Sequence, residues 1–82
     1  MGTFPQIDDI VLDEIKAVQE QYHRGAEVHE IQMRLAHPHY FGKNTNAQYS
    51  PRDVGWAIMN LIDYRSIELD RRGLLKHKGK TG

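Results

Sequence analysis

The chain has 82 residues, of which 39% are hydrophobic and 27% are charged, and it contains no cysteine. This length suits one domain with a single core. Eleven basic residues balance eleven acidic ones, which excludes a strongly basic nucleic-acid coat protein and a solvated acidic tail. Without cysteine, disulfide scaffolds, thiolate metal sites and thiol catalysis are excluded as well.

Hydropathy and the N-terminal residues predict a soluble, cytoplasmic protein. No run of about 18 apolar residues is present that could span a membrane. The acidic residues Asp8 and Asp9 close to the N-terminus do not fit a signal peptide. We expect a single domain over residues 7–78, with flexible tails at 1–6 and 79–82.

The zero net charge hides an uneven distribution along the chain. Residues 1–30 carry seven acidic and two basic residues, whereas residues 31–82 carry nine basic and four acidic ones. Five of these bases lie in the last twelve residues: Arg71, Arg72, Lys76, Lys78 and Lys80. This pattern predicts a basic end that suits a polyanion, although an ordinary solvated surface is the alternative.

Two helices are predicted in the first half of the chain. Over residues 7–23, apolar side chains recur at three- and four-residue steps, as in a helix with one buried face. Gly25 is expected to end this helix in the left-handed conformation. A shorter helix is predicted over 27–36, because Pro38 disfavours helical backbone at the residue before it.

Residues 37–49 are polar but rich in aromatic side chains, and they show no clear period. The segment is long for a connection within a compact domain. It is therefore either a functional loop or an element that the pattern does not reveal.

The third helix has the clearest signals. Ser50 suits the N-cap, Pro51 the first helical position and Asp53 the acidic position of a capping box. Behind them follows an apolar stripe, which predicts burial of one face over 50–63: Val54, Ala57, Ile58, Leu61 and Ile62.

A β-hairpin is predicted over residues 66–77. Residues 66–69 alternate between polar and apolar, residues 70–73 suit a tight turn with Gly73 at positive φ, and 74–77 return. In the alternative interpretation the third helix continues through Arg72, and only a short strand follows Gly73.

This order of elements resembles a winged helix-turn-helix domain over nearly the whole chain. The stretch Ser50-Pro-Arg-Asp-Val-Gly-Trp-Ala-Ile-Met-Asn-Leu-Ile62 looks like a recognition helix, and Ile67-Glu-Leu-Asp-Arg-Arg-Gly-Leu-Leu75 looks like a wing. The resemblance implies a mainly α fold with a small β-hairpin (α+β) and three helices. Two features depart from the family pattern: Arg65-Ser66 replaces a common glycine, and the connection between the second and third helices is long.

The resemblance implies a bacterial or phage type of DNA-binding protein, a transcriptional regulator or an excisionase-like accessory factor. Helix three would enter the major groove of double-stranded DNA, and the wing would contact the backbone or minor groove. Arg52 would contact guanine or phosphate and Asn60 adenine, while Trp56 and Met59 suit a thymine methyl or, equally, a protein. The DNA-binding residues predicted in this way are Arg52, Trp56, Asn60, Arg65, Arg71, Arg72, Lys76 and Lys78.

The same resemblance also implies a second copy of the chain as a partner. Such domains often bind DNA as dimers, for which helix one is the available apolar surface. Arg34 and Lys43 are expected to add positive charge to the DNA-binding side.

The alternative hypothesis is a winged-helix module that binds a polymerase, a replication protein or another protein partner. Zero net charge and the aromatic side chains Tyr40, Phe41, Tyr49 and Trp56 favour it. Loop 37–49 and helix three would then form the binding surface. A third possibility is a scaffold or packaging component with a DNA-binding type of fold. In a purely structural interpretation of Trp56, its side chain folds back against this loop.

No metal, other cofactor or enzymatic activity is expected. His37 and His39 would supply two imidazoles, whereas a zinc site needs three or four protein ligands. Asp8, Asp9, Asp13 and Glu14 would be solvated charges on an exposed helix, and a chain this small has little room for a walled pocket.

Overall fold

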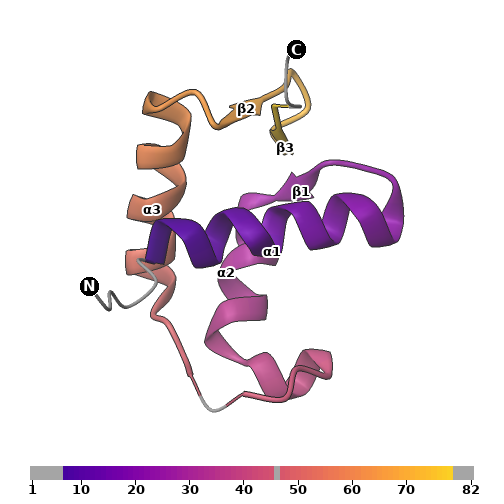
Figure 1. The fold of residues 1–82 in the computed structure, drawn as a ribbon, viewed down its shortest axis with the longest axis vertical. Coiled ribbons are helices and arrows are strands. Elements are labelled where there is room, and N and C mark those ends of the chain that lie inside the picture. The colour runs from indigo at the N-terminus through magenta and orange to yellow at the C-terminus, as the bar shows by residue number, and fades with distance from the viewer. Residues whose placement is uncertain (1–6, 46, 79–82) are drawn as a thin grey trace, which may run out of the picture.

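The computed structural model describes residues 7–45 and 47–78, so the expected tails and Lys80 lie outside the described residues. The predicted architecture, three helices followed by a hairpin, is confirmed (Figure 1). No described helix is long and apolar enough to cross a membrane. The elements in chain order are α1 (Ile7–Tyr22), β1 (Ala26–Glu27), α2 (Val28–Ala36), the 3-10 helix η1 (Pro38–Phe41), α3 (Pro51–Asp63), β2 (Ile67–Leu69) and β3 (Leu74–His77).

A single core joins the three helices and one face of the sheet. Figure 1 shows α1 crossing the other two helices, with the sheet at the C-terminal end of α3. The two predicted apolar stripes of α1 and α3 supply most of the core, as their helical spacing requires. The buried apolar side chains are Val11, Ile15, Val18, Ala26, Ile31, Leu35, Val54, Ala57, Ile58, Leu61, Ile67 and Leu75.

The apolar side of α1 is almost entirely packed into this core. Besides the buried residues, Ile7, Ile10 and Leu12 are partly buried and pack against the same cluster. Tyr22 is the one large hydrophobic side chain of α1 that is exposed. Within the described part of the chain, α1 therefore offers little apolar surface for the expected homodimer.

Both ends of α3 follow from identifiable caps. The Ser50 hydroxyl accepts a hydrogen bond from the Asp53 amide at 3.2 Å, as predicted. At the other end, the amides of Ser66 and Arg65 donate to the carbonyls of Leu61 and Ile62, and Arg65 has φ of 62°. This is a Schellman motif with arginine in the position that glycine usually takes. The helix stops there, so the alternative of a helix through Arg72 is wrong.

Strand β1 was not predicted, and the expected role of Gly25 is wrong. The left-handed residue after α1 is His23, with φ of 58°. Gly25 is needed for a close approach instead, because a Cβ there would lie 2.8 Å from the Leu74 Cβ and 3.0 Å from the Leu75 carbonyl oxygen. A strand of two residues has no periodicity, so only its pairing with β3 reveals it.

Strand β3 lies at the centre of a small antiparallel sheet with the order β1-β3-β2. Its register aligns Leu75 with both Ala26 and Leu69, and His77 with Ile67. The predicted hairpin over 66–77 is confirmed, with Gly73 at φ of 81° in the turn. Because β1 holds the far side of β3, the hairpin is fixed to the body of the protein rather than projecting alone.

Glu14 contradicts two expectations. Its side chain is 2% exposed on α1, where it accepts a 2.5 Å hydrogen bond from Arg34 Nε and a second hydrogen bond from Lys43 Nζ. The Arg34 guanidinium also lies 5.5 Å from the centre of the Phe41 ring. Glu14 is therefore no solvated charge, and Arg34 and Lys43 are both held by its carboxylate rather than free to contact DNA.

The segment 37–49 holds an element that the sequence did not reveal. Residues 38–41 form η1, which ends at Gly42 with φ of 77°. The segment is tied back to α2 because the Tyr49 amide donates to the Leu35 carbonyl at 3.0 Å. Together with the Lys43–Glu14 pair, this bond fixes where α3 begins.

Two glycine substitutions test the close approach of β1 and β3. We expect Gly25→Ala to lower the free energy of unfolding by about 1–3 kcal/mol, because the new methyl meets backbone. Gly55→Ala is the matched control: it lies inside α3, where the added Cβ meets only Gln32 Nε2 at 3.4 Å, and we expect a gain of about 0.5–1 kcal/mol. Urea unfolding measures both. Equal effects of the two substitutions would contradict this account of Gly25.

The same measurement tests the buried ion pairs. Glu14→Gln leaves the buried Arg34 without its counter-charge, and we expect a loss of about 3–5 kcal/mol. Lys43 is partly exposed, so Lys43→Ala should cost about 1 kcal/mol or less. A loss for Glu14→Gln as small as that for Lys43→Ala would show that the carboxylate is not needed to hold Arg34.

Candidate nucleic-acid interface

The outward face of α3 carries five exposed side chains opposite the buried stripe. At steps of three and four residues along the helix these are Arg52, Trp56, Met59, Asn60 and Asp63. With a rise of about 1.5 Å per residue, Arg52 and Asn60 are separated by about 12 Å along the helix axis. The face is mixed, with a cation and an amide on either side of two large apolar groups.

Arg71 and Arg72 lie exposed in the turn of the β2–β3 hairpin, as predicted. The turn is organised by Asp70, whose Oδ1 accepts hydrogen bonds from the amides of Arg72 at 2.8 Å and Leu74 at 2.9 Å. The Leu74 amide first, and then the Arg72 amide, lower the pKa of the Asp70 carboxyl below its ordinary value. The ionised carboxylate thus holds the backbone from which both arginine side chains extend.

The cations of the described chain fall into two groups. Arg24, Arg34, Lys43 and Lys76 each lie within ion-pair distance of a carboxylate. The remaining ones make no hydrogen bond or ion pair through their side chains among the described residues: Lys16, Arg52, Arg65, Arg71, Arg72 and Lys78. All of this second group except Lys16 belong to α3, to the turn that follows it or to the hairpin and the residue after it.

The structure does not bring all eight predicted residues together. Lys76 alternates with the buried Leu75 and therefore extends from the opposite face of the sheet, with its Nζ 3.6 Å from Asp70 Oδ2. Lys78 lies near Arg65, because its amide donates to the carbonyl of Ser66 at 3.0 Å. Arg71 and Arg72 occupy the other end of the hairpin. Positive charge thus lies at both ends of the hairpin, whereas Lys76 lies on the face of the sheet that points away from the core.

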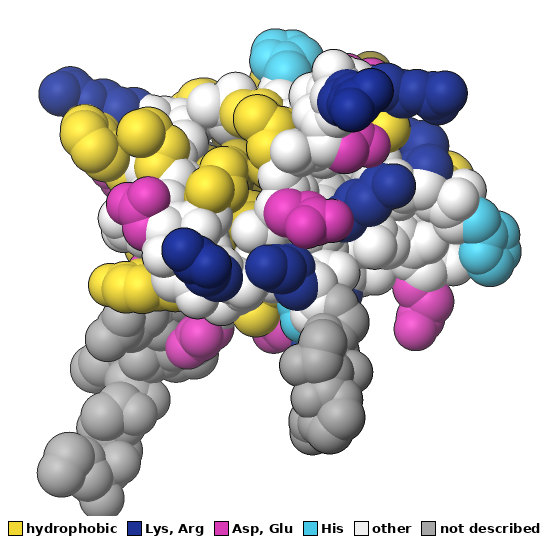
Figure 2. Space-filling model, turned by 90° about the horizontal axis from the view of Figure 1, so that it is seen from above, with side chains coloured by type: hydrophobic (Ala, Val, Ile, Leu, Met, Phe, Trp, Pro, Cys, Tyr) yellow, Lys and Arg dark blue, Asp and Glu magenta, His cyan; other side chains and the backbone are white. Residues whose placement is uncertain are grey.

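An apolar groove of about 420 Å³ runs between α3 and the hairpin. Trp56 and Met59 line it from α3, Val28 from α2 and Leu69 from β2. Trp56 is 59% exposed, Met59 58% and Leu69 52%. Figure 2 shows hydrophobic side chains gathered on the side of the molecule where α3 lies. The interpretation in which Trp56 folds back on loop 37–49 is therefore wrong.

Val28 and Leu69 were not predicted as site residues. Leu69 follows the alternation of a half-buried strand, and Val28 follows the pattern of a core position in α2. Neither pattern shows that both lie at the rim of the core, where α2, α3 and β2 diverge. The contacts between the three elements decide their exposure.

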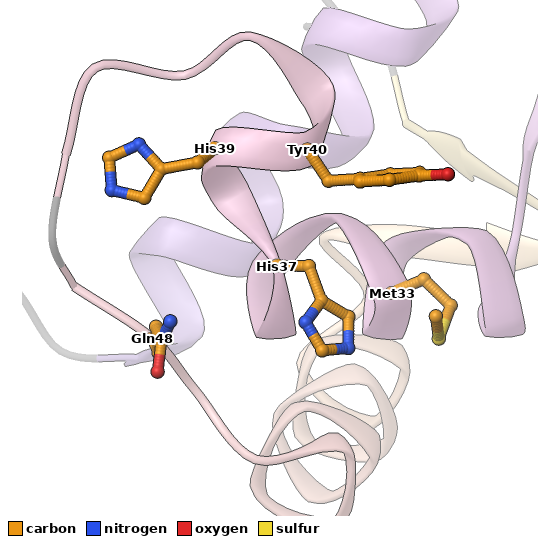
Figure 3. Close-up of a pocket in the computed structure, with 5 residues that line it drawn as sticks. All are labelled: Met33, His37, His39, Tyr40 and Gln48. Atoms are coloured by element: carbon orange, nitrogen blue, oxygen red, sulfur yellow. The ribbon is translucent and has the colours of Figure 1, made fainter.

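A second hollow, of about 540 Å³, lies at the end of α2. It is lined by Met33, His37, His39, Tyr40 and Gln48, and the two imidazole rings do not face each other (Figure 3). Within residues 7–45 and 47–78, no three His, Cys, Asp or Glu side chains gather in a way that could hold a metal ion. The two hollows share no lining residue, so loop 37–49 and the outward face of α3 line separate surfaces.

Comparison with protein-family models finds no match to this chain. No curated protein and no solved structure shows significant similarity either. The evidence for function therefore comes from the site residues themselves.

The role of Asp70 in the turn has a pH signature. A group with a lowered pKa in the folded state stabilises that state above its unfolded pKa, and the contribution is lost as the pH falls through the folded value. We expect NMR to show Asp70 titrating below the ordinary aspartate value of about 3.9. Asp70→Ala should speed exchange of the Arg72 and Leu74 amides while leaving amides in α3 unchanged. Unchanged exchange in the turn would contradict this role.

Proposed function

We propose that the protein binds double-stranded DNA as a winged helix-turn-helix domain, with α3 in the major groove and the β2–β3 hairpin as the wing. The observation that carries this proposal is a set of cations on α3 and around the hairpin whose side chains have no hydrogen-bond or ion-pair partner among residues 7–45 and 47–78: Arg52, Arg65, Arg71, Arg72 and Lys78. Cations elsewhere are largely matched by carboxylates. Unmatched cations on one part of a neutral protein favour a polyanionic partner.

The geometry supports a division of roles among these residues. Three residues separate the end of α3 from the start of the hairpin, so the hairpin would lie beside a helix placed in the major groove. Arg71 and Arg72 at its tip would then reach the flanking backbone or minor groove, and Arg65 and Lys78 the phosphates near the end of α3. Arg52 and Asn60 would face base edges. A transcriptional regulator or an excisionase-like factor is the biological role that such binding suits.

The electrostatic term in this binding is moderate. Residues 50–78 carry six bases and four acids, and Asp53, Asp63 and Glu68 remain exposed among the cations. Residues 7–30, with seven acids and two bases, would be repelled by DNA and would face away from it. We therefore expect the protein to make few phosphate contacts and to bind in one orientation, rather than to coat nucleic acid generally.

Protein binding is the second candidate function. The apolar groove beside Trp56 favours it, because exposed aromatic and methionine side chains are common at protein interfaces. The cations that flank the groove have no carboxylate partner in the described part of the chain, and a mostly apolar protein partner would not supply one. DNA would account for both the apolar groove and the flanking cations, so we rank DNA binding above protein binding.

Trp56 provides a direct test, because it is the one tryptophan of the chain. We would follow its fluorescence while titrating a mixed-sequence duplex at about 50 and 200 mM salt. Saturable binding that weakens with salt is the expected result. No response even at the lower salt concentration would rule out the proposed function, and a response to a protein partner alone would favour the second candidate.

The wing is tested by the salt dependence of the same binding. Changing Arg71 and Arg72 together to Ala should weaken binding and reduce the slope of log K against log salt by about 2, because each phosphate contact contributes about 0.9. Lys16→Ala is the matched control, since Lys16 is also exposed and has no partner among the described residues but lies on α1. An unchanged slope for the double variant, or an equal effect of Lys16→Ala, would contradict the wing assignment.

A further inference from the structure

We propose that α3 selects A·T-containing sites by seating the C5-methyl groups of thymine against the side chains of Trp56 and Met59. This inference rests on the proposed DNA binding and names the class of site that the helix would prefer. It starts from an unusual feature of the outward face of α3, namely that its centre is apolar.

Trp56 and Met59 are three residues apart and lie on the same face of α3, each more than half exposed. Along the axis they are separated by about 4.5 Å, which is close to the base-pair rise of about 3.4 Å. Two such side chains can therefore contact neighbouring base steps. The thymine methyl is the apolar group that unmodified DNA presents on its base edges in the major groove.

The polar residues around this pair fit an A·T edge. Asn60 lies one helical turn beyond Trp56, and an Asn side chain pairs with the N6 and N7 atoms of adenine. Reading the adenine of a base pair brings its thymine partner, and the methyl group, to the same part of the groove. Arg52 lies one turn before Trp56 and would anchor that end of the helix on a guanine or a phosphate.

Charge distinguishes this occupant from an apolar protein segment. Among the residues that the structure describes, the groove is lined by one charged residue, Arg52, and by no carboxylate. Beyond it, Arg71 and Arg72 extend from the hairpin without carboxylate partners among residues 7–45 and 47–78. In DNA, a thymine methyl group can pack against the apolar centre while the nearby phosphates pair with the surrounding cations.

The test replaces every thymine of a mixed-sequence duplex by deoxyuridine, which removes the C5-methyl and keeps the base-pairing groups. Affinity is measured by anisotropy of a dye on the DNA, so that Trp56 can also be changed. We expect the thymine duplex to bind about fourfold more tightly for each methyl in contact, the ratio that corresponds to about 0.8 kcal/mol per buried methyl-sized group.

Variants assign the effect to the two side chains. Met59→Gln and Trp56→Gln should each reduce the ratio of the two affinities toward one. Tyr40→Gln is the matched control, because Tyr40 is also a large exposed side chain, at 87%, but lies in η1. It should leave the ratio unchanged. Circular dichroism and urea unfolding check that each variant remains folded.

The outcomes separate this inference from the function on which it rests. Salt-sensitive binding of both duplexes with equal affinity would overturn methyl recognition while supporting DNA binding. A preference for thymine that persists in both Gln variants would also overturn it, because the methyl would be read elsewhere or through DNA shape. Binding of neither duplex would overturn the DNA-binding proposal itself. A Trp56 fluorescence response to a protein partner, with no response to DNA, would overturn it as well.

Discussion

One buried carboxylate sets the arrangement of much of this protein. Glu14 of α1 accepts hydrogen bonds from Arg34 of α2 and from Lys43 in the segment that leads to α3. Three stretches of chain thus meet at one charge, which would be costly to bury without Arg34 as its counter-charge. The contact fixes the long connection between α2 and α3. The bond from the Tyr49 amide to the Leu35 carbonyl holds the chain just before α3, and the buried stripe of α3 turns its other face outward.

A second constraint places the hairpin. Gly25 allows the two-residue strand β1 to approach β3, so that β3 is paired on both sides. A lone two-stranded hairpin would be marginally stable, whereas this one shares its inner face with the core. Arg65 ends α3 in the left-handed conformation and turns the chain directly into β2. The tip that carries Arg71 and Arg72 is therefore held in a defined position beside α3.

The cations of the described residues fall into two groups according to whether a carboxylate pairs with them. Arg34 and Lys43 hold the fold together through Glu14, and Arg24 closes on Glu30 with hydrogen bonds of 2.8 and 2.9 Å that lower the pKa of that carboxyl. Apart from Lys76, the cations of α3 and the hairpin have no such partner among the described residues. Between them lies an apolar face that a purely electrostatic DNA binder would not need. Methyl recognition and backbone contact together would give each part of this surface a role.

The sequence by itself determined the features that depend on interactions between residues close together in the chain. These are the apolar stripes of α1 and α3, the Ser50 cap, the turn at Gly73 and the exposure of Arg52, Asn60, Arg71 and Arg72. These follow from periodicity, capping and turn chemistry over a few residues. Only the tertiary structure decided the burial of Glu14, the approach at Gly25, the positions of β1 and η1, and the groove shared by Val28, Trp56 and Leu69. Each depends on residues far apart in the chain, or on elements too short to show a period. Whether a charged side chain is paired or available, in particular, is a property of contacts that sequence spacing does not encode.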